Sequence, residues 1–350
     1  MSAPRVVQGP RRPDLDLLRS VALVCIVLAH VEPPARVLEL RDFDVVLMMM
    51  VSGGASSISS HSVRSTSTLL RRLRRLVCPT YLFFSVFYTV EWLLGTPPSL
   101  RVILDTALLT NSVGYVWIIR VFVLMAIFGP LVAGLGILSS PRRVLLGSAF
   151  LLVLNELMII GVQRAGGNTR WGSVVMSVVP YTVGYLLPHL LGTVLVSART
   201  RVRVATSALA GALWMLIESF SALDSGELIS VQSQKYPPRA VYLVYGVFVG
   251  SALWALAPQL WRFASKSRFL TGLVSFIGQN SMWIYLWHIC LVPWWARALP
   301  GGDEWPLRWL AVVVSATFIQ RVQFLVVTSA VGSREPSSRA ATEVGRLLTG

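Results

Sequence analysis

"DLDLLRSVALVCIVLAH", residues 14–30, places ten almost entirely apolar residues between Arg19 and His30. The whole chain is 54% hydrophobic and only 13% charged, about half the charge of an average soluble domain, and its mean hydropathy is +0.65. These values indicate an integral membrane protein. A basic segment precedes the run, as in a signal peptide, but no small-residue cleavage site follows it. We therefore expect a retained signal anchor, the first of several membrane helices.

The apolar runs predict an all-α fold, a polytopic membrane helix bundle with about ten transmembrane helices. No repeat of fixed period and no inserted soluble domain is visible. We expect a cytoplasmic N-terminal segment (1–13), a membrane domain (14–330) and a disordered cytoplasmic tail (331–350). A short run at 101–109 is expected at the membrane surface. The predicted spans are 15–31, 43–60, 76–94, 115–138, 144–162, 172–197, 204–221, 240–258, 270–293 and 306–328.

The basic residues predict the orientation. Of the 31 Lys and Arg residues, 19 lie at span ends that an even number of spans places with the N-terminus, 9 lie on the opposite side and 3 lie within spans. Cytoplasmic segments carry an excess of Lys and Arg, so both termini are expected in the cytoplasm. The net charge of +15 and the pI near 10.8 are then explained by topology, and we expect no nucleic-acid partner.

The three cysteines, Cys25, Cys78 and Cys290, lie in or beside apolar runs. Their spacing suggests neither a disulfide framework nor a metal site, so no bound metal is expected. The arginine-rich, lysine-poor composition is typical of a GC-rich bacterium, and a multi-pass protein of the cell membrane follows from the spans.

Arg19 and His30 are separated by 11 positions, close to three full helical turns, so their side chains share one face of the helix. They lie about 16 Å apart along the axis, with Arg19 toward the cytoplasm. Asp16 precedes Arg19 by three residues and is placed to pair with it. A charged group within a bilayer is costly and often functional. The non-catalytic alternatives are that Arg19 extends to the membrane–water interface and that His30 has a structural role.

Two further segments carry polar groups. Ser52-Gly53-Gly54 allows close helix approach. In "RRLRRLVCP" the Arg-x-x-Arg spacing occurs twice, which places two guanidinium groups on one helical face, as an anion clamp requires. The alternatives are ordinary positive-inside charge and an anionic lipid site. The segment comprises Arg71, Arg72, Arg74 and Arg75.

Polar residues also interrupt later spans. Arg120 lies early in the fourth span and Glu156 in the fifth, and the two are a possible buried pair. In "FIGQNSMWIYLWH" polar residues recur at helical spacing and form a stripe along the ninth span. His288 is expected near the outer face, at a depth similar to that of His30. The stripe consists of Asn280, Ser281, Tyr285 and His288.

The first of these motifs resembles the signature of the acyltransferase type 3 family of membrane-bound acyltransferases. An Arg, ten residues and a His in the first helix are similar to Arg19 and His30, with Asp16 before them. Ser52-Gly53 is similar to the family's second-helix Ser-Gly. The Arg-x-x-Arg before a proline-bearing third helix matches Arg72 and Arg75 as the likelier pair.

The later motifs extend the resemblance over about residues 12–330. "VWIIR", which ends at Arg120, is similar to a Trp-Phe-(Leu/Ile)-Arg stretch of many members. Asn280-Ser281 followed by Tyr285 and His288 is similar to the penultimate-helix signature. The chain departs from the family in the second-helix run, which reads "MMMVSGG" where phenylalanines are usual.

The resemblance implies transfer of an acyl group, often acetyl, from acyl-coenzyme A to a hydroxyl of a glycan, a lipid-linked sugar or a secreted metabolite. Acyl-coenzyme A is then a donor substrate, and no cofactor is expected to be permanently bound. His30, Arg19 and Asp16 are the expected catalytic residues. The expected binding residues are Ser52, Arg72, Arg75, Arg120, Asn280, Tyr285 and His288.

A transporter or flippase of a glycan or small molecule is the alternative. Ten helices with interior charges are typical of that class as well. Transporters often contain paired halves with broken helices, and no convincing internal repeat is visible here. A non-catalytic structural membrane protein is favoured least, because several polar motifs coincide.

Overall fold

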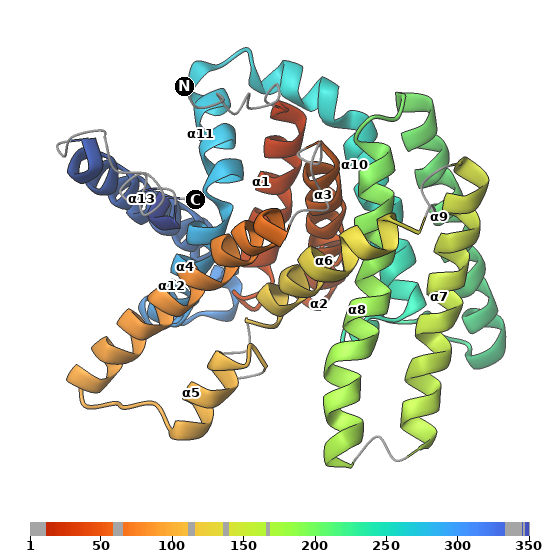
Figure 1. Ribbon diagram of the computed structural model, residues 1–350, viewed down its shortest axis with the longest axis horizontal. Helices are drawn as coiled ribbons and strands as arrows, with labels where there is room; N and C mark the ends of the chain where they lie inside the picture. Colours follow the sequence, from red (N-terminus) through yellow and green to blue (C-terminus); the bar gives the residue numbers. More distant parts are fainter. Residues whose placement is uncertain are drawn as a thin grey trace.

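The computed structural model describes residues 12–58, 66–110, 116–135, 140–165, 169–332, 345 and 347–349. Within these residues the fold is all-α, as predicted, with thirteen α-helices and two short 3₁₀ turns (Figure 1). The helices are α1 (Pro13–Leu28), α2 (Ala35–Leu40), α3 (Asp44–Ile58), α4 (Thr66–Leu93), α5 (Leu100–Ala107), α6 (Trp117–Ala133), α7 (Pro141–Arg164), α8 (Arg170–Leu195), α9 (Thr200–Ser225), α10 (Ala240–Ala264), α11 (Arg268–Gln279), α12 (Ser281–Ala298) and α13 (Trp305–Gly332).

Six helices of the described chain are long and apolar enough to cross a membrane, namely those at Thr68–Leu93, Arg142–Arg164, Gly172–Leu195, Thr200–Ser225, Ala240–Ala264 and Gly302–Ala330. The helix at Trp117–Ala133 is apolar but shorter. The chain is therefore a multi-pass membrane protein. Each predicted span overlaps at least one helix, whereas the count of ten crossings remains a prediction. The predicted surface run at 101–109 forms the short helix α5.

Helices α1 and α3 form the centre of the bundle (Figure 1). Helix α3 packs against α8, α1 and α10, and most of its residues are buried. Its closest approach is to α8, where a β-carbon on Gly53 would collide with the backbone of His189 and one on Gly192 with the backbone of Met50. The close approach expected of the Ser52-Gly53-Gly54 segment is therefore confirmed. Short, buried helices with polar residues are possible here because other helices surround them.

The predicted ninth span, 270–293, is not one continuous helix. It is divided at Asn280 into α11 and α12. The Asn280 side chain donates to the carbonyl of Phe276 at 2.7 Å, and Gln320 donates to Asn280 Oδ1 at 3.3 Å. Just before the break, Gly278 lies so close to Asp16 of α1 that a β-carbon would meet its backbone. The backbone of Asn280 leaves the helical conformation here, and the contact at Gly278 together with the Asn280 side-chain hydrogen bonds fixes the position of the break.

Most of the predicted tail, 331–350, lies outside the described residues. Leu347, Leu348 and Thr349 are helical and contact the end of the bundle. Trp283 Nε1 donates to the carbonyl of Leu347 at 3.0 Å, and Gln323 donates to that of Leu348 at 2.6 Å. The N-terminal segment 1–11 lies outside the described residues as well.

Candidate active site

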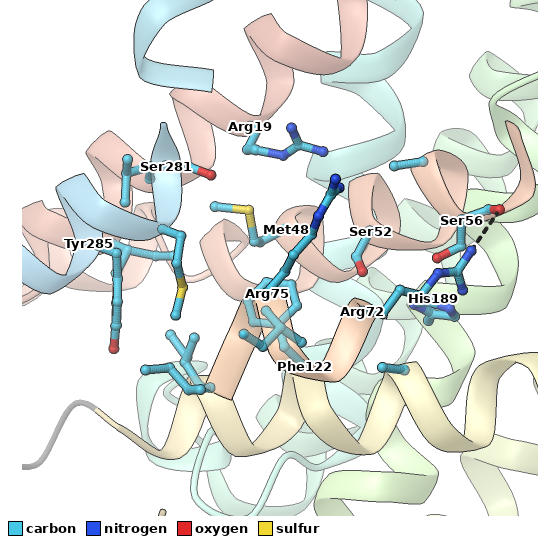
Figure 2. Close-up of a pocket in the computed structure, with 18 residues that line it drawn as sticks. Arg19, Met48, Ser52, Ser56, Arg72, Arg75, Phe122, His189, Ser281 and Tyr285 are labelled. Carbon is cyan, nitrogen blue, oxygen red and sulfur yellow. Dashed lines mark hydrogen bonds between the residues drawn. The ribbon is translucent and has the colours of Figure 1, made fainter. Parts of the chain in front are cut away.

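A cavity of about 300 Å³ opens between α1, α3, α4, α6, α8 and α12 (Figure 2). Among the described residues, five of the predicted site residues line this cavity and five do not. Those in the lining are Arg19, Ser52, Arg72, Arg75 and Tyr285. Those outside it are Asp16, His30, Arg120, Asn280 and His288.

Three guanidinium groups from two helices converge on one end of this cavity. Arg72 and Arg75 are three residues apart on α4 and share the face that lines it, whereas Arg71 and Arg74 are not in the described lining. Arg72 Nη2 donates to the carbonyl of Ser56 at 3.4 Å. Figure 2 shows Arg75 extending toward Arg19 of α1. Like charges gathered in a partly buried space repel one another, so this end of the cavity favours an anion.

Arg19 is held in place by its surroundings. Its Nη1 donates to the carbonyl of Gly278 at 3.1 Å and lies 3.9 Å from Asp16 Oδ1, which confirms the predicted pairing. Asp16 is itself buried and accepts a hydrogen bond from Gln279 at 3.2 Å. Asp16 thus joins α1 to the end of α11 and orients Arg19 from behind the cavity wall.

Much of the remaining wall is apolar. Leu23 and Ile26 of α1 follow Arg19 at helical spacing, and Ile119 and Phe122 of α6 line the cavity as well. An apolar wall beyond a cationic end suits a ligand with an anionic part and a long, less polar arm.

The two histidines that the sequence placed at similar depth lie together. The ring centroids of His30 and His288 are 5.2 Å apart, and Tyr285, which lines the cavity, lies 4.8 Å from the His288 ring. His288 is fully buried, and its Nδ1 contacts the carbonyl of Tyr285. The histidine pair therefore adjoins the cavity through Tyr285, and His30 follows Ile26 by one helical turn.

The predicted Arg120–Glu156 pair is wrong. Arg120 is buried with its guanidinium 5.3 Å from the centre of the Tyr181 ring. Glu156 instead pairs with Arg239 at 2.8 Å and accepts a hydrogen bond from the backbone of Ala240 at 2.6 Å. The carboxylate of Glu156 therefore stabilises the backbone N–H groups at the start of α10. Spacing along α6 and α7 does not reveal this partner.

His189 of α8 lines the cavity as well and is not among the residues predicted from the sequence. It is 3% exposed, and its ring lies where a β-carbon on Gly129 would collide with it. Figure 2 places it beside Arg72 at the cationic end. It lies inside an apolar run, so the available signal was the rarity of histidine in a membrane segment.

A buried ionic cluster beside His30 was missed as well. Lys235 lies 3.1 Å from Asp42 and 3.3 Å from Asp44, while Arg41 lies 3.1 Å from Asp42 and also bonds Asp44. Burial raises the pKa of Asp42, and Lys235 and Arg41 oppose this effect. All four side chains are at most 4% exposed. The order Arg-Asp-Phe-Asp at 41–44 was the available signal, but Arg41 and Lys235 had entered only the count of basic residues on the side opposite the N-terminus.

One family model matches the chain. The model of the acyltransferase domain, acyltransferase 3, covers residues 12–319. The matched stretch contains the cationic end of the cavity, the histidine pair and the break at Asn280. No curated protein and no solved structure matches the chain significantly.

Proposed function

Because the chain belongs to the acyltransferase 3 family and is a membrane-embedded acyltransferase, we propose that it transfers an acyl group, acetyl in the simplest case, from acyl-coenzyme A to a hydroxyl group. The acceptor is a glycan, a lipid-linked sugar or a secreted metabolite. The observation that carries this proposal is a cavity lined by three arginines and by Tyr285, whose ring contacts His288 of the histidine pair just outside the lining.

The donor binds with its phosphates at the cationic end. Arg72 and Arg75 form charge-assisted hydrogen bonds to the phosphate oxygens, and Arg19, oriented by Asp16, neutralises the remaining charge. Ser52 and His189 lie at the same end and can donate further hydrogen bonds. The pantetheine arm then follows the apolar wall toward Tyr285, which brings the thioester near the histidine pair.

His30 is the general base. It accepts the proton of the acceptor hydroxyl while the hydroxyl oxygen attacks the thioester carbonyl carbon. The carbon–sulfur bond then breaks, and the proton passes to the departing thiolate, which gives an ester and free coenzyme A. His288 and Tyr285 position the imidazole of His30 and the acceptor. A covalent route, in which His30 first accepts the acyl group, uses the same residues.

The orientation follows from the charge distribution. With both termini in the cytoplasm, the starts of α1 and α4 face the cytoplasmic donor, and the turn after α1 that holds His30 faces outward. The cavity then connects a donor on one side of the cell membrane with an acceptor on the other.

The test is an assay of acetyl transfer by the purified full-length protein in lipid nanodiscs. Incubation with labelled acetyl-coenzyme A and bacterial surface glycans should release coenzyme A thiol and place label on the acceptor. Absence of label from every hydroxylated acceptor, together with unaided transport of a glycan across vesicles, contradicts the proposal in favour of a transporter. A gene knockout compared by mass spectrometry of surface glycans and secreted metabolites identifies the acceptor through a lost acyl mass.

A rapid-mixing experiment separates the two routes. Without an acceptor, direct transfer releases no burst of coenzyme A thiol, whereas an acyl-enzyme releases about one equivalent per active site. The His30→Ala variant removes the burst if His30 carries the acyl group.

A further inference from the structure

A second cavity, of about 420 Å³, lies between α7, α8, α9 and α10 and shares no lining residue with the first. Its wall is almost entirely aliphatic, with Leu152, Leu191, Leu213 and Val247 among its residues. On α8, Leu187 and Leu191 face this cavity while His189, between them, faces the candidate active site. The second cavity therefore lies behind α8 and has no part in the proposed acyl transfer.

The cavity is a groove that is open to the side. Helix α7 packs along α8, and α9 packs along α10 (Figure 1). Leu145 of α7 and Leu209 of α9 line the groove yet remain 55% and 57% exposed. A lipid-facing opening between these two helices gives a hydrocarbon chain access from the bilayer.

The length of the groove along the helices is close to the thickness of one leaflet of the bilayer. It begins at Ser140, which caps the start of α7, and follows α7 to Leu152. Twelve helical residues span about 18 Å, close to half of a hydrocarbon core about 30 Å thick. The lining residues of α8 lie in its last turns and those of α9 in its first turns. Because α8 ends at Leu195 and α9 begins at Thr200, both sets lie near the same end of the helix bundle.

Positive charge surrounds the mouth of the groove. Arg142 and Arg143 follow the capping Ser140, and Arg199 and Arg201 flank the start of α9 next to the lining residue Val202. All four arginines are exposed. Neither helix carries an acidic residue in its first turn, and both present backbone N–H groups at this end.

Arg203 does not belong to this set. It is buried and donates to the carbonyls of Leu195 and Val196, which it satisfies at the end of α8. The four outer arginines are exposed at the mouth, where their charge favours a ligand that is anionic at one end and aliphatic along its length. A second copy of this chain would bring the same positive charge to the mouth, which disfavours it as the occupant.

We propose that this groove binds an anionic phospholipid, with one acyl chain between α7 and α9 and the phosphate on Arg142, Arg143, Arg199 and Arg201. Basic residues between membrane helices recognise such headgroups through charge, and the groove adds a shaped site for the chain. The proposal is independent of the acyl-transfer function.

The experiment uses the full-length protein in nanodiscs that contain either phosphatidylglycerol or phosphatidylcholine with a photoactivatable group at the middle of one acyl chain. After illumination, mass spectrometry maps the labelled peptides. We expect phosphatidylglycerol to label 144–152 and 202–213 at least about fivefold more than phosphatidylcholine does. Equal labelling by the two lipids, or labelling spread evenly over lipid-facing helices such as α13, overturns the proposal.

The variant R142Q/R143Q/R199Q/R201Q tests the headgroup site. In this variant the ratio of labelling by phosphatidylglycerol to labelling by phosphatidylcholine at these peptides should fall to about 1. The matched control R262Q/K266Q/R268Q removes three basic residues around the α10–α11 turn, outside the groove lining, and should keep the preference. An unchanged preference in the first variant, or an equal loss in both, overturns the proposal.

The variant Leu209→Trp tests the chain site, because the indole fills the groove. Labelling of 144–152 by phosphatidylglycerol should fall at least about fivefold while labelling of α13 is unchanged. Leu145→Trp fills the groove from the opposite wall and replaces this variant if Leu209→Trp elutes as an aggregate. Full labelling in a folded variant contradicts a chain in the groove.

Discussion

The imidazole rings of His30 and His288 lie 5.2 Å apart, although 258 positions separate the two residues in a chain of 350. His30 lies in the turn after α1, and His288 lies one turn after Tyr285 on α12. Tyr285 is in contact with His288 and with the cavity that Arg19, Arg72 and Arg75 line. The pair therefore lies just beyond the part of the cavity that Tyr285 lines, away from the arginine end, a separation suited to a ligand with a charged head and a distant reactive group.

We predict that His30→Ala lowers kcat for acetyl transfer by about 10²–10⁴-fold, because a general base of this kind contributes that factor. The KM for acetyl-coenzyme A should change little, since the arginines bind the donor. The measurement is release of coenzyme A thiol under saturating donor. His61→Ala is the matched control and should keep full activity, because this histidine has no role in the proposed mechanism. Wild-type kcat in a His30→Ala protein with an unchanged unfolding midpoint would refute the catalytic role.

We predict that R72A/R75A raises the KM for acetyl-coenzyme A by at least about 100-fold, because each lost charge-assisted hydrogen bond weakens binding by about 1.5–3 kcal/mol. The variant R71A/R74A is the matched control. It removes the same charge from the same turns of α4, outside the described lining, and should raise KM far less. Isothermal titration with coenzyme A gives an independent value. Equal losses in the two variants would show a general effect of charge in place of a clamp.

We predict that Gly278→Ala lowers the stability by about 1–3 kcal/mol, because the added β-carbon meets the backbone of Asp16 and forces α11 away from α1. Arg19 loses its bond to the Gly278 carbonyl in the same movement, so donor binding should weaken as well. Gly272→Ala on the same helix is the control, because a β-carbon there meets nothing within 4 Å. It should be neutral or stabilising by up to about 1 kcal/mol. Thermal unfolding in detergent, followed by tryptophan fluorescence, measures both.

We predict that Lys235→Met lowers the stability by about 3–5 kcal/mol, because it leaves Asp42 and Asp44 buried with Arg41 as their remaining partner in the cluster. Arg101→Ala is the comparison. Its ion pair with Asp105 is 3.9 Å long and the arginine side chain is 91% exposed, so the change should stay within about 0.5 kcal/mol. Similar unfolding midpoints for the two variants would mean that the buried cluster adds nothing to stability.

The sequence predicted the parts of this site that depend on spacing along one helix. Arg72 and Arg75 line the cavity together because residues three apart share a face. Arg19 lines it as predicted, and the same rule explains why Leu23 and Ile26, which were not predicted, follow it on the cavity face. The helical rise along each span also predicted that His30 and His288 lie at a similar depth in the membrane. Their rings do lie together. The roles of these residues in catalysis remain predictions.

The contacts between distant segments could not be predicted from spacing along one helix. The partner of Glu156 is Arg239, and Lys235 closes the cluster with Asp42 and Asp44, pairings between segments far apart in the chain. Charge patterns list many possible partners for each group, and packing selects among them. His189 was overlooked for the same reason, because only the crossing of α3 and α8 at Gly53 brings it to the cavity.

By itself, then, the sequence determined the all-α membrane fold, the approximate positions of the helices and the helical faces that carry Arg19 and Arg72, because hydropathy and helical phase are local properties of the chain. The tertiary structure alone decided which faces meet. It divided the predicted ninth span at Asn280, because Gly278 lies against Asp16 and the Asn280 side chain bonds the preceding carbonyl. Such contacts depend on the shapes of two distant segments at once, and no local pattern in either segment contains that information.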